Sequence, residues 1–404
     1  MKLNIIVLSF FSLLFLSSIA QKQRCGSDYK IAERIAENPE LIELRNQQNK
    51  EIAAYPLAKS RTLITIPVVV HILYQNSTQN ISNTQIQSQI NSLNQDYRRL
   101  NADASQTPST FSGEDTEIEF CLATLDPNGN PTSGITRTFT TVNEIGTTNN
   151  YYRTSQGGKD IWNRDEYLNI WVCDLGNTYL GFAYPPGVAP AAYDGLVIDY
   201  RNFGTLGTVT SPYDKGRTAT HEIGHFFNLE HLWGSGNGGC NSTDFVSDTP
   251  TQYEENYGCL NHPSPSCGNS GDMFMNYMDY VDDACMNAFT LGQKNRMISA
   301  IQLYRTSLLT SNGCGLVGLT ENSLQSDFTI FPTYATKTIQ LTSTKINNYQ
   351  VDIYAIDGKI VSAYTTKGNT NLLLDVSTLE SGMYFLRITS NSTSFTEKFL
   401  KVAQ

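Results

Sequence analysis

The residues of this 404-residue chain best suited to chemistry lie in one short segment. Three of its five histidines, His221, His225 and His231, fall within eleven residues. Residues four apart on a helix project from one face, so His221 and His225 can bind a single metal ion. Glu222 follows the first histidine and can reach a metal-bound water without being a ligand itself. Three neutral imidazoles leave one tetrahedral position open, which predicts a catalytic zinc site.

The third histidine requires a turn in the chain. His231 can join the other two only if the helix ends before it, and Asn228 stands where that turn must occur. Asparagine is the best residue after glycine for the left-handed conformation that such a turn needs. A chance match on a solvated helix is the alternative for His221 and His225 alone, and the offset of His231 argues against it.

This segment is similar to the zinc-binding motif of the metzincin metallopeptidases, which has glycine in place of Asn228. Other details resemble the pappalysin family of metzincins over roughly residues 62–310. They are Asp248-Thr249-Pro250, the segment Asn276–Tyr280, the placing of Cys285 seven residues after Met278, and Phe289–Gln293. The resemblance implies a zinc endopeptidase that hydrolyses peptide bonds of extracellular proteins.

The resemblance also assigns roles to single residues. It implies that the three histidines bind zinc and that Glu222 is the general base on the zinc-bound water. It implies that Met278 supports the site sterically and that Tyr280 stabilises the oxyanion or acts as a flexible fifth ligand. Ordinary core packing is the alternative for Met278 and for Tyr280. An extended substrate would add as a strand to the edge at residues 180–183.

The sequence leaves the substrate preference open. Relatives that cut before basic residues use an acidic group near the methionine-containing turn. Asp282 and Asp283 are nearby, although Ala284 directly precedes Cys285. The sequence therefore allows a preference for arginine without establishing one.

Eight cysteines indicate disulfides in an exported protein. Four of them lie between positions 240 and 285, and sequence alone allows three pairings. The pappalysin resemblance implies Cys240–Cys267 and Cys259–Cys285. Cys121 and Cys173 fall on expected strands and are the candidates for a third bridge, which leaves Cys314 unassigned.

Asp244, Asp248 and Thr249 place oxygen ligands in a loop rich in glycine and asparagine, which suits Ca²⁺. Relatives bind calcium in the same segment, and the resemblance therefore implies a structural calcium site here. Aspartates that form turns or cap a helix are the alternative.

Cys25 lies in a segment, Arg24–Asp28, that resembles the cysteine switch of matrix metalloproteinases. A thiolate is a good zinc ligand, so Cys25 can take the position of the water and keep a precursor silent. A disulfide between Cys25 and Cys314 is the alternative.

The elements around these residues divide the chain into four parts. Residues 1–20 have the pattern of a secretory signal peptide. Residues 21–61 are polar, with one helix expected over 31–46, little to bury and a processing site at 59–61, and they are typical of a pro-segment. Residues 62–318 form the expected catalytic domain, and residues 323–404 are the fourth part.

The catalytic domain is predicted to be α+β, with a twisted mixed sheet, an active-site helix and an irregular, disulfide-tied lower part. Strands are expected at 62–74, 117–125, 167–173 and 195–199. A helix should begin after a cap at Ser82 or Asn83, with Ile86, Ile90 and Leu93 on its apolar face, and further helices are expected at 218–229 and 291–308. Residues 234–284 should be mostly irregular.

Residues 323–404 contain no cysteine and alternate apolar with polar side chains, which predicts a small β-sandwich. This part resembles the C-terminal sorting domain of type IX secretion. The features are residues 328–332, 351–359, 379–386 and the basic end Lys398–Lys401. The resemblance implies that outer-membrane secretion machinery is a partner. A carbohydrate- or surface-binding sandwich is the alternative.

The composition argues against two classes of function, nucleic-acid binding and an integral membrane role. The formal charge is −10 and only 16% of residues are charged, so no basic face for nucleic acid is expected. The one long apolar run is at the N-terminus and is too short for a stable membrane span. We therefore predict a secreted zinc endopeptidase made as a zymogen. A secreted binding or adhesion protein with a structural or inactive zinc site is the competing hypothesis, and Glu222 disfavours it because a structural site has no need of a base.

Overall fold

The computed structural model describes residues 22–56, 63–235, 238–314, 328–343, 348–355, 358–366, 370–390 and 393–402. The expected signal peptide and the expected processing site at residues 59–61 lie outside these ranges. The chain forms two compact units, Met1–Cys314 and Gly315–Gln404.

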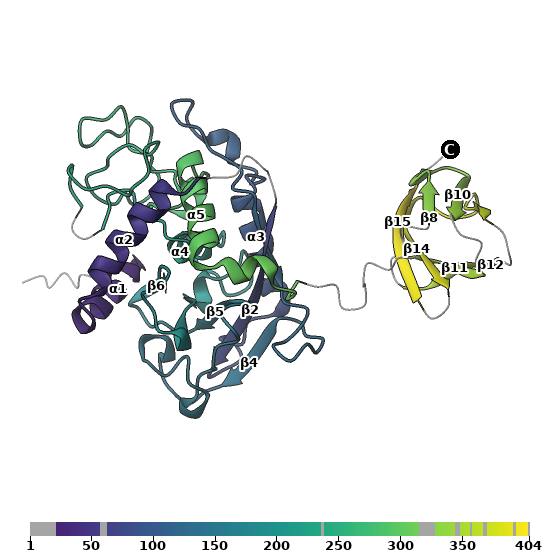
Figure 1. The fold of residues 1–404 in the computed structure, drawn as a ribbon, viewed down its shortest axis with the longest axis horizontal. Helices are drawn as coiled ribbons and strands as arrows, with labels where there is room; N and C mark the ends of the chain where they lie inside the picture. Colours follow the sequence, from purple (N-terminus) through teal and green to yellow (C-terminus); the bar gives the residue numbers. More distant parts are fainter. Residues whose placement is uncertain are drawn as a thin grey trace, which may run out of the picture. The chain divides into compact units, whose positions relative to one another are not determined.

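The first unit is built on a mixed sheet of seven strands (Figure 1). The strand order is β1-β6-β7-β5-β2-β3, with β4 also pairing with β2. Every pairing is parallel except that of β6 with β7. The strands are β1 (Gln23–Cys25), β2 (Ile64–Tyr74), β3 (Ile118–Leu122), β4 (Ile135–Phe139), β5 (Leu168–Cys173), β6 (Tyr179–Ala183) and β7 (Leu196–Asp199).

The sequence predicts three helices of this unit, and two of them, α3 (Asn83–Tyr97) and α4 (Arg217–Phe226), pack on the sheet. In α3 the Ser82 hydroxyl accepts a hydrogen bond from the Gln85 backbone N–H and caps the helix. The active-site helix is α4, and α5 spans Leu291–Tyr304 after a capping box at Thr290. Short 3₁₀ helices cover Ala104–Gln106, Ile145–Thr147, Thr154–Gln156, Ala191–Tyr193, Tyr200–Asn202, Asp283–Cys285 and Thr306–Thr310.

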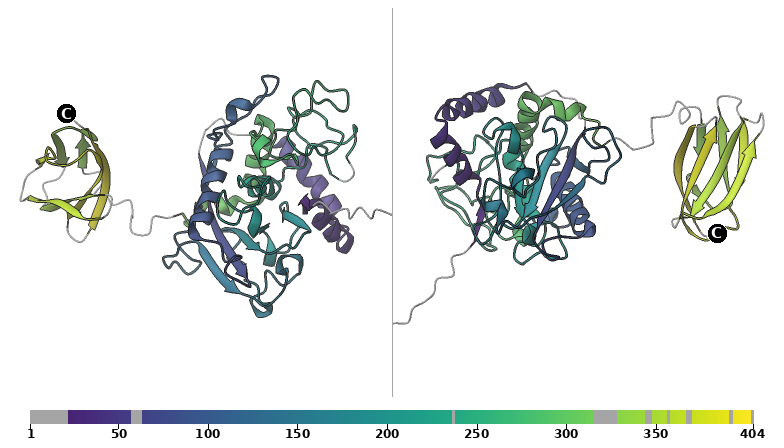
Figure 2. Two further views of the ribbon diagram at one scale, coloured as in Figure 1. Left: turned by 180° about the vertical axis from the view of Figure 1, so that it is seen from behind. Right: turned by 90° about the horizontal axis from the view of Figure 1, so that it is seen from below.

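The N-terminal segment differs from the sequence-based expectation. It forms two helices, α1 (Ser27–Glu37) and α2 (Leu41–Ala54), because Pro39 disfavours the helical conformation at the residue before it. It also contributes β1, which the sequence did not predict. Both helices lie along one side of the unit, with α1 next to β6 (Figures 1 and 2). The expectation that this segment buries little was wrong, since Arg24 and Cys25 are each only 1% exposed.

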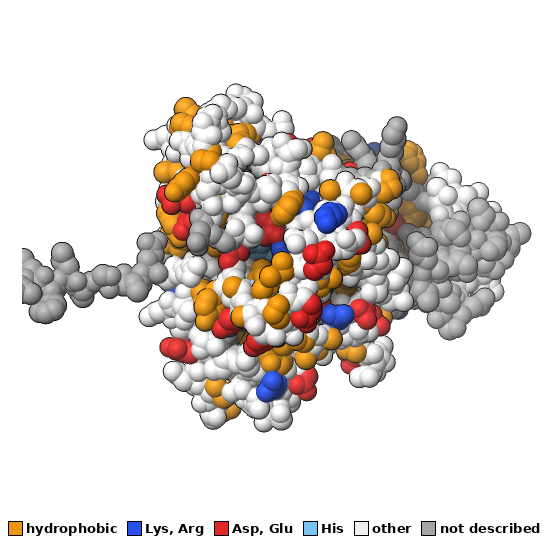
Figure 3. All heavy atoms as spheres, turned by 60° about the vertical axis from the view of Figure 1, so that its left-hand side comes forward, with side chains coloured by type: hydrophobic (Ala, Val, Ile, Leu, Met, Phe, Trp, Pro, Cys, Tyr) orange, Lys and Arg blue, Asp and Glu red, His pale blue; other side chains and the backbone are white. Residues whose placement is uncertain are grey.

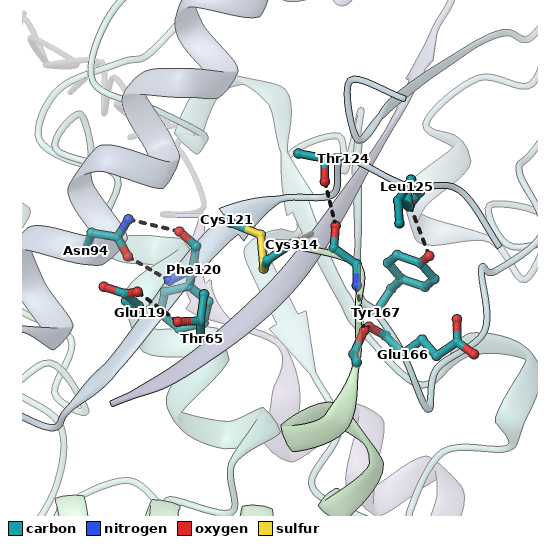
Figure 4. Close-up of a disulfide and its surroundings, with 12 residues drawn as sticks. Thr65, Asn94, Glu119, Phe120, Cys121, Thr124, Leu125, Glu166, Tyr167 and Cys314 are labelled. Atoms are coloured by element: carbon teal, nitrogen blue, oxygen red, sulfur yellow. Dashed lines mark hydrogen bonds between the residues drawn. A yellow bond between two sulfur atoms is a disulfide. The ribbon is translucent and has the colours of Figure 1, made fainter. Parts of the chain in front are cut away.

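Three disulfides cross-link the first unit. Cys240–Cys267 and Cys259–Cys285 tie the irregular region together. The third joins Cys121 to Cys314 (Figure 4). The expected bridge between Cys121 and Cys173 was wrong, because β2 lies between their strands and separates these strands by about 9–10 Å. Cys121 is also opposite Pro67 of β2, whereas Val172, next to Cys173, is opposite Ile72, so the two cysteines lie well beyond disulfide reach. Cys25 and Cys173 are free and buried.

The surroundings of the third disulfide fix the end of the unit. Next to it, the Thr124 backbone N–H and hydroxyl both donate to the Gly313 carbonyl, at 2.8 and 3.3 Å. Tyr167 donates its hydroxyl proton to the Leu125 carbonyl at 3.0 Å (Figure 4). The C-terminal end of the unit is therefore held against β3 and the loop after it.

The second unit is all β, with two sheets around one apolar core (Figure 2). The strand orders are β13-β10-β8 and β12-β11-β14-β15-β9. β11 and β12 are paired antiparallel on either side of position 358. The strands are β8 (Phe328–Phe331), β9 (Tyr334–Ala335), β10 (Thr338–Ser343), β11 (Tyr349–Ala355), β12 (Ile360–Thr366), β13 (Asn371–Asp375), β14 (Gly382–Ser390) and β15 (Thr393–Lys401).

Among the described residues, no helix has the length and apolar character needed to span a membrane. On the face seen in Figure 3, acidic and basic side chains are scattered among neutral ones. The combined architecture is α+β, as the sequence predicts.

Candidate metal centre and active site

The metal centre is built on α4 and the turn that follows it. Every residue of α4 is buried, and His221 and His225 point from one of its faces. Asn228 has a φ of 70°, which is the left-handed conformation expected for the turn. The chain then brings His231 back beside them. The three Nε2 atoms lie 3.0 to 3.3 Å from one another.

The outer nitrogens of the imidazoles establish that the site fits a cation. His221 Nδ1 lies 2.7 Å from the Tyr277 carbonyl, and His225 Nδ1 lies 2.8 Å from that of Leu229. His231 Nδ1 lies 3.1 Å from Asp28 Oδ2. Since these oxygens only accept hydrogen bonds, each Nδ1 carries the proton and three Nε2 lone pairs converge. Tetrahedral zinc with bonds of about 2.0–2.1 Å separates its ligands by about 3.3 Å, close to the observed spacing.

Burial keeps two of the imidazoles neutral. It lowers the pKa of His221 well below its ordinary value and that of His225 to about 3. For His231 burial also acts to lower the pKa, but the Asp28 carboxylate outweighs it and the net shift is upward. Neutral imidazoles are the form that binds a metal ion.

Cys25 completes the ligand set from outside the catalytic segment. Its Sγ and one nitrogen from each histidine all lie within 4.8 Å of one another. β1 carries Cys25 there by pairing with β6, where Cys25 is opposite Gly181. The Gly26 N–H also donates to the Gly181 carbonyl at 2.9 Å. Cys25 is therefore placed beside the metal centre, and Cys314, its alternative partner, is bonded to Cys121.

Glu222 lies next to the ligands and is fully buried. Its Oε2 accepts a hydrogen bond from the Ser27 hydroxyl at 2.8 Å and lies 3.5 Å from Cys25 Sγ. Its Oε1 is buried without a hydrogen-bond partner among the described residues. Burial raises the pKa of Glu222 to about 7, against the opposing effect of the Ser27 and Cys25 hydrogen bonds.

The segment Asn276–Tyr280 lies directly under α4. Met278 is completely buried, and a Cβ added to Gly224 would overlap its Sδ. The Met278 N–H donates to Asn276 Oδ1 at 2.9 Å, which fixes the turn. Tyr280 is 3% exposed, with its ring 5.0 Å from that of His231 and 5.7 Å from that of His221. The structure therefore brings Met278 and Tyr280 to the metal centre.

A closed pocket next to the metal centre holds the side chain of Arg24. Its Nη2 lies 3.0 Å from Asp283 Oδ1, and both side chains are at most 1% exposed. Its guanidinium carbon lies 4.7 Å from the centre of the Tyr213 ring. Asp283 Oδ2 accepts the backbone N–H groups of Lys215 and Arg217, which join this pocket to the start of α4.

Sequence reasoning missed most of these N-terminal contacts. It identified Cys25 as a possible ligand, but not Ser27 on Glu222, Asp28 on His231 or Arg24 on Asp283. The signal was present, because all four belong to the segment Arg24–Asp28 already singled out. The sequence did not indicate the strand pairing with β6 that orients these four residues.

The three residues expected to bind calcium do not all face one point. Thr249 donates its hydroxyl proton to Asp244 Oδ2 at 2.6 Å. Asp248 instead caps α5, since its carboxylate accepts the Thr290 hydroxyl at 2.7 Å and the Gly292 N–H at 2.8 Å.

A helix with this arrangement of histidines on a mixed sheet defines a zinc metalloendopeptidase of metzincin type. The comparisons with known proteins identify the family. The family model described as pregnancy-associated plasma protein-A matches residues 151–302. An extracellular metalloprotease of Arthroderma benhamiae is 33% identical over 296 residues, covering 71% of this chain and 94% of that protein. The chain belongs to this peptidase family.

Solved structures agree with that assignment. A promirolysin mutant from Tannerella forsythia is 44% identical, with a TM-score of 0.67, and the match covers 74% of this chain and all of that one. Mature mirolysin of the same organism, in complex with a cleaved peptide, is 49% identical with a TM-score of 0.56, covering 61% of this chain and 98% of that one.

The second unit has its own match. The model of the secretion system C-terminal sorting domain matches residues 329–402. Together with the extracellular relatives, this domain makes the protein a secreted one.

Proposed function

We propose that this chain is an exported zymogen in which residues 21–61 silence a Glu222-assisted zinc endopeptidase. Its parts are a signal peptide (1–20), the pro-segment (21–61), a catalytic domain (62–318) and a sorting domain (323–404). The observation that carries the proposal is the placing of Cys25 Sγ beside three converging imidazole nitrogens. A thiolate there takes the fourth ligand position of a tetrahedral zinc ion.

The pro-segment also occupies the catalytic base and the edge of β6, both of which a substrate needs. Ser27 donates its hydroxyl proton to Glu222 and accepts the backbone N–H of Ala183 at 2.9 Å. β1 fills the edge of β6, where an extended peptide would otherwise add as a strand. Latency therefore follows from a blocked ligand position, a blocked base and a blocked binding edge.

The chemistry of the active enzyme follows from the residues left after the pro-segment has gone. When bound by the three histidines, zinc supplies a Lewis acid that lowers the pKa of water and polarises the scissile carbonyl. Glu222 accepts the proton of the attacking water through its carboxylate and returns it to the leaving amine. Tyr280 donates a hydrogen bond from its hydroxyl to the oxyanion.

The Arg24 pocket supports a preference for substrates with a basic residue. Asp283 is fully buried at its base, and a cationic side chain already fills it. Because Arg24 is adjacent to Cys25, the substrate residue that replaces it lies next to the scissile bond. We propose arginine or lysine at that position.

Two further parts of the proposal concern calcium and export. Ca²⁺ would bind at Asp244 and Thr249, whose side-chain oxygens lie 2.6 Å apart, and stabilise the irregular region, while Asp248 keeps its place at the start of α5. The sorting domain would engage the outer-membrane machinery of type IX secretion. Metal analysis that finds zinc without calcium would remove the first, and normal release of protein lacking residues 323–404 would remove the second.

The test of the proposed function compares the precursor with processed protein on a denatured protein substrate. We expect the processed protein alone to be active, with activity lost to phenanthroline and in Glu222→Gln, which should still contain zinc. A binding or adhesion protein would be unaffected by Glu222→Gln. Cys25→Ala should raise the activity of the unprocessed precursor, and a precursor as inactive as before would contradict the switch.

A further inference from the structure

A second cleft lies beside the Arg24 pocket, on the side from which β1 enters. It has a volume of about 420 Å³. Its lining includes Lys22, Leu180, Arg201, Tyr213 and Asp282. Tyr213 also contacts Arg24, so the cleft and the pocket share a wall.

Lys22 lines this cleft, and its side chain reaches a buried carboxylate as that of Arg24 does in the pocket. Alternate side chains of an extended segment face the same side, so Lys22 and Arg24 point together while Gln23 between them is exposed. Lys22 Nζ lies 2.9 Å from Asp199 Oδ2, and the Asp199 side chain is completely buried. The pro-segment thus places two cations, two residues apart, on two buried carboxylates.

The cleft keeps its acidic character after the pro-segment leaves. Asp199 accepts hydrogen bonds from the Leu175 N–H at 3.1 Å and from Arg201 Nε at 2.8 Å, so its carboxylate stays held without Lys22. Asp174 lies 3.2 Å from the same guanidinium, and Asp282 lines the cleft. Asp174 and Asp199 then share the single guanidinium of Arg201, and Asp282 adds a third carboxylate at the cleft wall, so a mobile cation is the complementary ligand.

We propose that this cleft is a second specificity subsite for a basic side chain. It takes the substrate residue two positions beyond the one in the Arg24 pocket, on the side away from the scissile bond. An extended substrate paired with β6 repeats that spacing whichever way it runs, because side chains of a strand alternate. This inference rests on the proposed endopeptidase function and adds Asp199 and Asp282 as residues that determine specificity.

The experiment uses processed enzyme and internally quenched peptides with one arginine. Lysine, alanine or glutamate stands two residues before or two residues after it, and mass spectrometry identifies the cleaved bond. On the side away from that bond we expect lysine to exceed alanine about fivefold in kcat/KM, the size expected of a partly exposed ion pair. Glutamate should fall below alanine, and the other side should show no preference.

Variants separate the subsite from general charge effects. Asp199→Asn should remove most of the lysine preference, because Asp199 is the carboxylate that pairs with Lys22, and Asp282→Asn at the cleft wall should reduce the preference. Asp165→Asn, a carboxylate outside this cleft, is the matched control and should keep the full preference. Equal rates for the three peptides in the wild-type enzyme would overturn the inference while leaving the endopeptidase intact.

A binding measurement tests the subsite without turnover. Processed Glu222→Gln protein is titrated with the same peptides, labelled for fluorescence anisotropy. We expect about fivefold tighter binding of the lysine peptide than of the alanine peptide, with the difference reduced at high salt. Equal affinities would overturn the subsite. A lack of any cleavage by processed wild-type enzyme, with this binding preference present, would count against the proposed function and not against the subsite.

Discussion

Replacing Arg24 by alanine should release the pro-segment more readily than almost any other single change in it. Arg24 and Asp283 form an ion pair with both side chains at most 1% exposed. Removing one partner from such a pair typically costs about 3–5 kcal/mol, because the other charge stays buried and unpaired. Arg24 Nε and Nη1 have no hydrogen-bond partner among the described residues, which places the value near the lower end.

A loss of about 3 kcal/mol in docking corresponds to about a 150-fold rise in the population of released pro-segment. The uncleaved Arg24→Ala precursor should therefore show residual peptidase activity up to that factor above the wild-type precursor. Initial rates on a quenched peptide, with gels confirming that the chain is still unprocessed, provide the measurement. Thermal unfolding of the same samples would show whether the catalytic unit remains folded.

Two controls make this result specific. Arg24→Lys retains one cation for the single contact to Asp283 Oδ1 and should stay close to wild type. Arg34→Ala removes a more exposed cation that pairs with Glu37 within α1, and its effect should be small. An Arg24→Ala precursor as silent as wild type would refute the reasoning, and so would an Arg24→Lys precursor as active as Arg24→Ala.

Three further predictions follow from single contacts. Ser27→Ala removes a hydrogen bond to the Glu222 carboxylate, so the residual activity of the precursor should rise about tenfold. If initial-rate assays show no rise, Ser27 does not block Glu222 as the catalytic base. Gly224→Ala gains about 1 kcal/mol of helix propensity, but the added methyl group overlaps Met278 at a cost of about 1–3 kcal/mol. Urea unfolding should therefore show net destabilisation, which Met278→Ala relieves. A single variant more stable than wild type would be evidence against the close packing. Burial lowers the pKa of His71 to about 4, below the ordinary value of 6.5, so the unfolded state takes up the proton first as the pH falls. The contribution of neutral His71 to the free energy of unfolding is complete above pH 6.5 and is lost toward pH 4. The loss between pH 7 and pH 5 is about 2 kcal/mol. A His71→Gln variant with the same pH dependence as wild type would show that His71 is not the source.

The local part of the site could be predicted from the sequence. Two histidines four apart share a helix face by the geometry of the helix alone, and Asn228 marks the turn because few residues tolerate a positive φ. Helices α3, α4 and α5 were predicted because apolar periodicity and capping are also local signals.

The contacts that join distant parts of the chain depended on the tertiary structure. Cys121 meets Cys314, 193 residues away, because β2 separates it from Cys173. Arg24 meets Asp283 across 259 residues because β1 adds to the edge of β6 in one particular register. Periodicity reports which face of an element is apolar, but it carries no information about which strand pairs with which edge. The sequence by itself therefore determined the zinc-binding chemistry, and only the folded chain decided what covers it and which carboxylates line its substrate cleft.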